Sequence, residues 1–212
     1  MIVVLLGAEC TGKSSLTRLL GERLGVPTVP EYLREWCLRA GRTPRVDEQA
    51  AIAAEQQRRI EAQQAELLIA DTSALMIAAY SELYFDDRSL WTDALERQRR
   101  VDLTLLMGLD LPWVADGLFR DGPAIREATD ALLRRELQAA GIPFQTLYGP
   151  VDIRVQQALR AIGNVLGRPL VADRPEWANG RRPWVCEKCS DPDCEHRLFT
   201  DLLKQRQHPI EP

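Results

Sequence analysis

The stretch MIVVLLGAECTGKSSL, residues 1–16, is the part of the sequence that predicts the fold. Its apolar start, MIVVLL, is rich in β-branched residues and predicts a short buried strand. GAECTGKS, residues 7–14, follows directly and matches the phosphate-binding pattern G-x-x-x-x-G-K-[S/T] at every fixed position. Leucines at helical spacing, from Leu16 to Leu24, predict the helix that this motif requires. The chain is therefore expected to bind a nucleoside triphosphate.

The residue types of this loop suit the phosphates of ATP. Gly7 and Gly12 allow tight turns and a close approach of the backbone to phosphate oxygens. The loop N–H groups and the positive end of the following helix form a nest for anions. Lys13 can reach the β- and γ-phosphates, and the Ser14 hydroxyl is a ligand for Mg²⁺. We expect the nucleotide to contact Gly7, Glu9, Cys10, Thr11, Gly12, Lys13, Ser14 and Ser15.

Length and composition are those of an ordinary globular protein. The 212 residues suffice for one α/β domain and an appendage, and 45% of them are hydrophobic. The formal net charge of −4 gives no reason to expect a nucleic acid or an anionic membrane as partner. No apolar run is long enough to span a membrane, and the apolar start lacks the basic region of a signal peptide. We expect a cytoplasmic protein, whose oligomeric state the sequence does not define.

Short apolar runs alternate with helical patterns along most of the chain. The predicted strands are residues 2–6, 26–29, 67–71, 103–110 (with the strand exit) and 144–148. The predicted helices are residues 13–24, 31–40, 47–66, 72–83, 90–100, 125–140 and 153–166. This alternation predicts an α/β fold, an open five-stranded parallel sheet with helices on both faces. The composition changes near Val171, so we expect one domain over residues 1–171 and an extension over residues 172–212.

Carboxylates follow three of the predicted strands, where the working residues of such sheets lie. Asp71 ends the apolar run LLIAD and fits a carboxylate that holds Mg²⁺ directly or through water. The alternative is that Asp71 and Thr72 cap the next helix, and both roles are compatible. Glu31 follows the second strand and could accept the proton of an attacking hydroxyl. Its alternative role is an acidic residue favoured in the first turn of a helix. Asp110 follows the fourth strand.

Cationic and aromatic side chains accompany these carboxylates. Arg34 lies one helical turn beyond Glu31 and could contact phosphate or substrate, or simply face solvent. The loop after the fourth strand predicts a lid whose arginine neutralises charge on the phosphates. Its aromatic residue could stack on a flat ring or pack beneath the loop. The candidates from this segment are Trp113, Asp116, Arg120 and Arg126.

Four segments together resemble the NadR-type ribosylnicotinamide kinase domain, which belongs to the P-loop nucleoside-kinase group. They are GAECTGKSSL (7–16), PEYLRE (30–35), LLIADT (67–72) and DLTLLMGLDLPWVADGLFR (102–120). The resemblance covers about residues 1–166, and its most specific part is the PWVADGLFR block. It implies a P-loop kinase fold that transfers the γ-phosphate of ATP to the 5′-hydroxyl of nicotinamide riboside, giving nicotinamide mononucleotide.

The resemblance also implies roles for individual residues. Glu31 and Asp71 would be the base and the metal-linked carboxylate, and Trp113 and Asp116 would lie near the substrate or the lid. Phe119 stands before Arg120 where the family pattern has arginine directly after leucine. The sequence has two histidines, both near its end, so we do not expect the adenylyltransferase activity that many NadR-type proteins carry.

Two other functions fit the same residues. The first is a kinase for another nucleoside-like alcohol, with the same ATP and Mg²⁺ site. The second is a regulatory nucleotide-binding module whose extension contacts a partner protein or a nucleic acid. The paired carboxylates and the lid arginines favour an enzyme.

A cysteine cluster marks the extension. CEKCSDPDCEH places Cys186, Cys189, Cys194 and His196 at spacings that suit a tetrahedral Zn²⁺ site. Such a closed site would be structural, since the segment is too short to bury a core of its own. His208 is an alternative fourth ligand, and free thiols or a redox pair are the alternatives to a metal.

Overall fold

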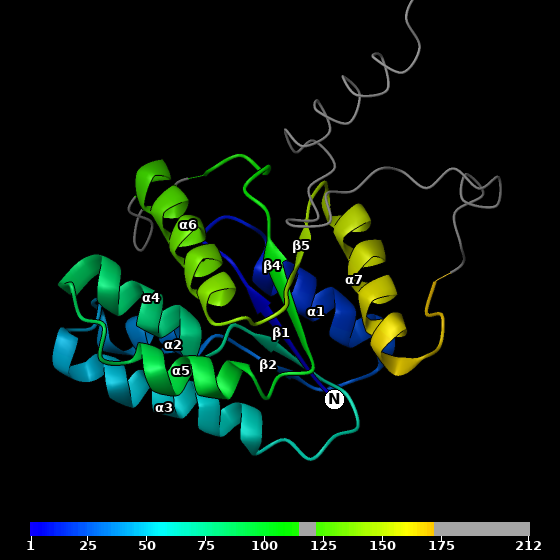
Figure 1. Cartoon of the computed structure of the whole chain (residues 1–212), viewed down its shortest axis with the longest axis horizontal. Helices are drawn as coiled ribbons and strands as arrows, with labels where there is room; N and C mark the ends of the chain where they lie inside the picture. Colours follow the sequence, from blue (N-terminus) through cyan, green and yellow to red (C-terminus); the bar gives the residue numbers. More distant parts are fainter. Residues whose placement is uncertain (115–121, 172–212) are drawn as a thin grey trace, which may run out of the picture.

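The computed structural model describes residues 1–114 and 122–171. Its five parallel strands form a sheet in the order β2-β3-β1-β4-β5. They are β1 (Ile2–Leu6), β2 (Thr28–Val29), β3 (Leu68–Asp71), β4 (Leu103–Met107) and β5 (Gln145–Leu147). Met1 lies at the lower edge in Figure 1, so the carboxyl ends of the parallel strands meet along the upper edge.

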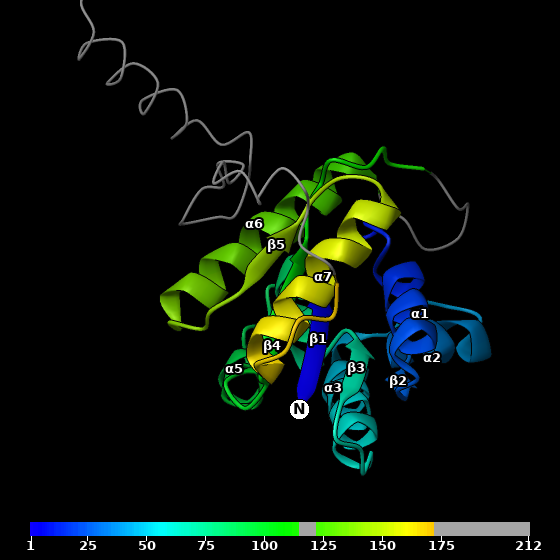
Figure 2. The same cartoon turned by 90° about the vertical axis from the view of Figure 1, so that its right-hand side faces the viewer.

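Seven helices of the described residues cover the two faces of this sheet. They are α1 (Lys13–Leu24), α2 (Tyr32–Ala40), α3 (Val46–Glu61), α4 (Ala74–Phe85), α5 (Trp91–Gln98), α6 (Pro123–Ala139) and α7 (Val151–Leu166). Figures 1 and 2 show α1 and α7 on one face, with α3, α4, α5 and α6 on the other, and α2 packs against α3. The α/β fold with five parallel strands that the sequence predicts is therefore confirmed.

Each face of the sheet carries its own hydrophobic core. Val3 and Leu5 of β1 pack with α1 and α7, while Val4 and Leu6 pack with α3, α4 and α6. Successive side chains of a strand point to opposite faces, so a central strand covered on both sides must be apolar throughout. This is why the first strand is a continuous apolar run and not an alternating one.

The second strand is shorter than predicted. The apolar run predicts residues 26–29, whereas β2 contains only Thr28 and Val29. The backbone N–H of Val26 donates to the carbonyl of Gly21 at 3.1 Å, so Val26 belongs to the turn that ends α1. Helix termination uses the residue that the apolar pattern assigned to the strand.

The third helix also ends earlier than predicted, at Glu61 and not at residue 66. Residues 62–66 are good helix formers, so the local pattern gives no stop signal. The carbonyl of Glu66 instead accepts a hydrogen bond from the amino terminus of Met1 at 2.7 Å, which holds this segment beside the start of β1. The other helices begin and end within two residues of the prediction.

Residues 172–212 lie outside the described residues, and with them the predicted zinc ligands Cys186, Cys189, Cys194 and His196. The zinc site and the domain boundary therefore stay predictions. Within residues 1–114 and 122–171, no helix has the length and apolar character to cross a bilayer, and no three Cys, His, Asp or Glu residues form a cluster able to hold a metal ion.

A substitution of Gly163 can test how tightly α7 is packed. A Cβ at this position would lie 2.7 Å from the backbone carbonyl of Arg168, which returns over α7. Gly163→Ala should lower the free energy of unfolding by about 1–3 kcal/mol, because the overpacking exceeds the gain in helix propensity. Chemical denaturation measures this change. Asn164→Ala, an exposed neighbour in the same helix, should be neutral or stabilising; a stabilised Gly163→Ala would contradict the packing argument.

Candidate active site

The phosphate loop links the carboxyl end of β1 to the start of α1. Gly7 has a φ of 145° and Gly12 a φ of 82°, values that favour glycine. A Cβ on Gly7 would lie 2.8 Å from the Cβ of Met107 at the end of β4, so the loop is pressed against the neighbouring strand. Cys10 has a φ of 56°, so the loop also bends sharply at a residue that is not glycine.

Lys13 points into this loop. It is 8% exposed, and its Nζ donates to the carbonyls of Gly7 at 2.6 Å and Ala8 at 3.1 Å. The loop thus encloses a positive charge at the amino end of α1, where an anion is also favoured by the helix dipole. Ser14 and Ser15 are exposed at the same helix end. The arrangement suits the phosphates of a nucleotide.

Asp71 lies at the end of β3, paired in register with Leu5 of β1. It is 3% exposed, and within the described residues its Oδ1 has no hydrogen-bond partner. A buried carboxylate oxygen without a partner is costly, and a cation or its bound water would satisfy it. Ser73 caps α4, which leaves Asp71 free of that role. Asp71 could hold a cation at this place, and its role as an Mg²⁺ ligand together with Ser14 stays a prediction.

Glu31 occupies the N-cap position of α2, and its side chain makes no capping hydrogen bond. Burial raises the pKa of its carboxyl, and Asp71 raises it further, while Lys13 and Arg34 lower it. Nε of Arg34 lies 3.7 Å from Oε2 of Glu31. The charges of Glu31, Asp71 and Lys13 are therefore close enough to affect one another, although Glu31 and Asp71 lie 40 positions apart in the sequence.

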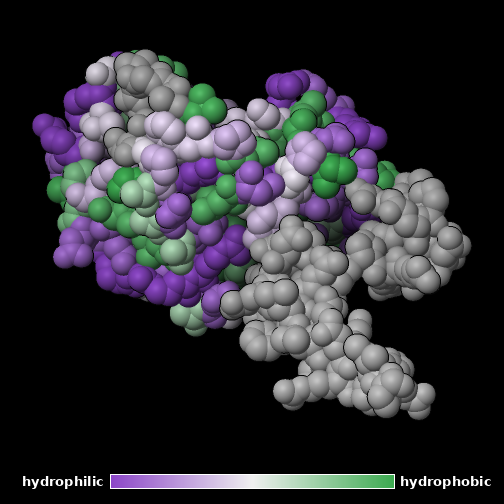
Figure 3. Space-filling model, turned by 90° about the horizontal axis from the view of Figure 1, so that it is seen from above, coloured by the Kyte–Doolittle hydropathy of each residue, from purple (hydrophilic) through white to green (hydrophobic). Residues whose placement is uncertain are grey.

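A cavity of about 650 Å³ extends from the phosphate loop to the outer end of α4. Lys13 and Glu9 line it at the loop, and Glu31 and Arg34 line it on α2. Its remaining wall consists of Leu33, Cys37, Thr43, Pro44, Arg45, Val46, Gln49, Tyr80, Tyr84, Phe85, Ile125 and Thr129. Figure 3 views the carboxyl edge of the sheet and shows hydrophilic and hydrophobic residues interspersed on its described part.

Several residues that line the cavity are not predicted from the sequence. Tyr80 and Tyr84 stand one turn apart on α4, with ring centroids 6.1 Å apart, and burial raises the pKa of the Tyr80 hydroxyl. Gln49 of α3 is 3% exposed, and its Oε1 has no hydrogen-bond partner among the described residues. The tyrosine pair in an apolar helix is a signal that could have been used. Nothing in the sequence separates Gln49 from the other glutamines of its helix.

The segment after β4 contacts the phosphate loop. Nε1 of Trp113 donates to Oε1 of Glu9 at 2.9 Å, and Sγ of Cys10 donates to the carbonyl of Val114 at 3.1 Å. Trp113 therefore contacts the loop and is not part of the cavity wall.

Arg126, a predicted lid arginine, is 6% exposed, and its Nη2 donates to the carbonyls of Leu109 and Leu111. In this structure Arg126 supports the segment that carries Trp113, and its contact with phosphate stays a prediction. The other two candidates of this loop, Asp116 and Arg120, lie outside the described residues.

Comparison with solved structures supports the predicted resemblance. A NadR protein in complex with NR shares 21% sequence identity with this chain and has a TM-score of 0.67, over 82% of this chain and 53% of that one. A NadR protein in complex with NAD and AMP-PNP has a TM-score of 0.63 at 21% identity, over 82% of this chain and 51% of that one. This chain therefore spans about half the length of the NadR chains.

A more distant likeness is to a deoxyadenosine kinase from M. mycoides with the products dCMP and dCDP bound. It shares 13% identity, with a TM-score of 0.56 over 77% of this chain and all of that one. At these identities the likenesses establish a shared fold. No curated protein matches the sequence.

A family model decides the classification. The model described as AAA domain (AAA_28) matches residues 2–154, which include the phosphate loop, all five strands and the start of α7. The match covers well over half of the chain. With the P-loop geometry described above, it shows that the chain belongs to the AAA domain (AAA_28) family of P-loop proteins.

Proposed function

We propose that this protein is an ATP-dependent kinase for a small nucleoside-like alcohol, with nicotinamide riboside as the first candidate. The observation that carries the proposal is the cavity that joins Lys13 of the phosphate loop to the partly buried carboxylate of Glu31. One end of this cavity suits a γ-phosphate, and its interior suits an acceptor. The NadR protein of similar fold binds NR, which supports the choice of acceptor.

The proposed reaction is an in-line transfer of a phosphoryl group. Glu31 takes the proton of the acceptor hydroxyl, the hydroxyl oxygen forms a bond to the γ-phosphorus, and the bond to the β-phosphate oxygen breaks to release ADP. Lys13 and the N–H groups of the loop hold the phosphate oxygens and stabilise their charge. When bound by Ser14 and Asp71, Mg²⁺ would neutralise charge on the β- and γ-phosphates.

The cavity wall supports an acceptor with a flat ring and polar groups. Its volume of about 650 Å³ lies in the range of about 300–1,000 Å³ that is usual for small-molecule sites. Tyr80, Tyr84 and Phe85 offer aromatic surface, which favours a cationic ring such as a pyridinium. Gln49 offers an amide whose carbonyl lacks a partner among the described residues, so a hydrogen-bond donor on the acceptor would offset its burial.

The acceptor is identified by measuring ADP release. We expect nicotinamide riboside to stimulate ADP formation by the purified protein with Mg²⁺ and ATP, with nicotinamide mononucleotide as the product. Deoxyadenosine, other ribosides and buffer alone serve as comparisons. Turnover with a different nucleoside would keep the kinase and change the acceptor. Tight ATP binding without any acceptor-dependent turnover would contradict the kinase and favour a regulatory nucleotide-binding module.

Substitutions of Glu31 and Lys13 should distinguish the loss of phosphoryl transfer from the loss of ATP binding. Glu31→Gln should lower kcat by about 10²–10⁴-fold with little change in ATP affinity, because the amide keeps the shape of the carboxylate and cannot accept the proton. Lys13→Ala should abolish transfer and weaken ATP binding, because it removes the positive charge inside the loop. Steady-state kinetics and a titration with AMP-PNP measure the two effects. Equal losses of kcat and ATP affinity in Glu31→Gln would contradict its role as the base.

Arg34 should shift the pH dependence of proton transfer to Glu31. Activity requires ionised Glu31, so it rises with pH through the pKa of that carboxyl, which burial raises. Arg34 lowers this pKa, and Arg34→Met should therefore move the acidic limb of the pH–kcat profile to higher pH. Arg39→Gln, a change to an exposed arginine of the same helix that contacts Glu35, is the matched control and should leave the limb in place. An unmoved limb in Arg34→Met would exclude Glu31 as the titrating group.

A further inference from the structure

A buried arginine lies behind the phosphate loop. Arg154 belongs to the first turn of α7, is 1% exposed, and is the largest fully buried side chain of the described residues. A guanidinium in such a place needs acceptors for its donors, and the structure supplies four. They are the carbonyls of Thr11, Gly108 and Gly149 and the carboxylate of Asp110.

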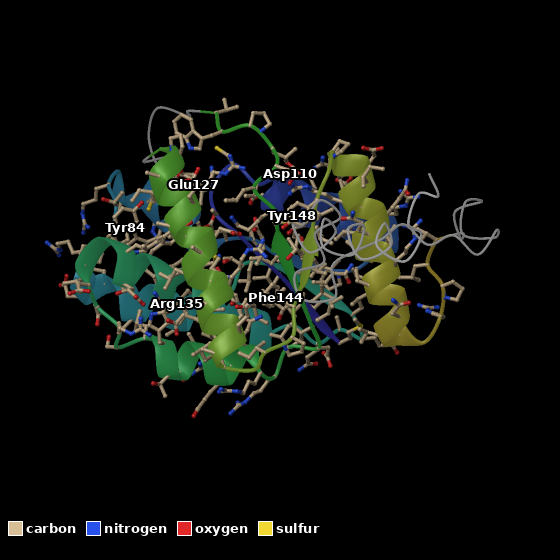
Figure 4. The ribbon with its side chains drawn as sticks, turned by 45° about the horizontal axis from the view of Figure 1, so that its top comes forward. Tyr84, Asp110, Glu127, Arg135, Phe144 and Tyr148 are labelled. Atoms are coloured by element: carbon tan, nitrogen blue, oxygen red, sulfur yellow. The ribbon has the colours of Figure 1, made fainter. Side chains whose placement is uncertain are left out.

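These four acceptors come from three separate loops. Thr11 belongs to the phosphate loop after β1, Gly108 and Asp110 follow β4, and Gly149 follows β5. Asp110 also links two of these loops directly, since its other oxygen accepts a hydrogen bond from the N–H of Gly149 at 2.5 Å. Figure 4 shows Asp110 and Tyr148 near each other at the upper ends of β4 and β5. One side chain thus ties together the three loops along the edge where a nucleotide would bind.

The bond to Thr11 has a direct consequence for phosphate binding. Nη1 of Arg154 donates to the carbonyl of Thr11 at 2.7 Å, which fixes the orientation of the peptide between Thr11 and Gly12. The described backbone has no cis peptide bonds, and in a trans peptide the C=O and the N–H point in opposite directions. The N–H of Gly12 therefore points away from the Arg154 guanidinium.

We propose that Arg154, held by Asp110, is a positioning residue for ATP: it orients the Thr11–Gly12 peptide toward the phosphates and keeps the turn at Gly149 in register with the phosphate loop. The inference rests on the proposed nucleotide site, although it does not depend on the identity of the acceptor. Asp110, which follows the fourth strand, thus acts through Arg154 and not on the substrate.

The geometry distinguishes this role from that of a generic ion pair. A lysine would keep the charge, but its single ammonium cannot reach four acceptors in the directions that a planar guanidinium serves. Arg154→Lys should therefore release the Thr11 peptide while charge balance with Asp110 is kept. Asp110→Asn is the milder second variant, because the amide oxygen can still accept from Gly149 while the ionic bond to Arg154 is lost.

The test is calorimetric titration of each variant with AMP-PNP and Mg²⁺, at a temperature at which thermal denaturation shows it to be folded. Arg154→Lys should raise the Kd of AMP-PNP by on the order of tenfold, as expected when a binding group is displaced by a fraction of an ångström. Asp110→Asn should raise it by a smaller factor in the same direction.

Glu136→Gln is the matched control. Glu136 is 8% exposed and pairs with Arg88 and Arg135, and Figure 4 shows Arg135 well away from Asp110 along α6. This variant should lower Tm and leave the Kd unchanged. A Kd within twofold of wild type in folded Arg154→Lys and Asp110→Asn would overturn the positioning role, whatever their Tm. Failure of the wild type to bind AMP-PNP would overturn the proposed nucleotide site itself, and the inference with it.

Discussion

The contact between the phosphate loop and β4 is the constraint on which the rest of the structure depends. Gly7 lies so close to Met107 that a side chain at this position would collide with the neighbouring strand. The backbone can therefore leave β1 and return into α1 within six residues, which places Lys13 and the amino end of α1 at the carboxyl edge of the sheet. Every other residue of the candidate site is positioned relative to this turn.

The parallel sheet brings charged residues that are far apart in the sequence close together in space. Because all strands point the same way, the residues that follow β2, β3 and β4 gather beside the loop. Burial makes their charges interact strongly: Lys13 lowers the pKa of Glu31 and Asp71 raises it, in addition to the larger effect of desolvation. The raised pKa of Glu31 is consistent with the proposed role of this carboxylate as a proton acceptor.

Much of this could be predicted because the signals are local. The apolar run, the glycines and the Lys-Ser pair of residues 1–14 define a phosphate loop, and alternation of strand and helix patterns defines the sheet. The two errors in element bounds have different causes. Val26 completes the turn that ends α1, a local helix-ending contact that the apolar strand pattern does not represent. The segment before β3 is held by the amino terminus of the chain, a distant partner about which helix propensity carries no information.

The sequence by itself determined the phosphate loop and the succession of strands and helices along the chain, because both depend on short stretches and on residue types. Only the tertiary structure decided what surrounds the loop. It brought Gln49, Tyr80 and Tyr84 from two helices into one cavity, and it buried Arg154 behind Thr11 although 143 positions separate them. The physical reason is that each of these roles depends on a partner or a cavity contributed by another element. The spacing of residues along the chain does not show which elements lie next to one another in the folded protein.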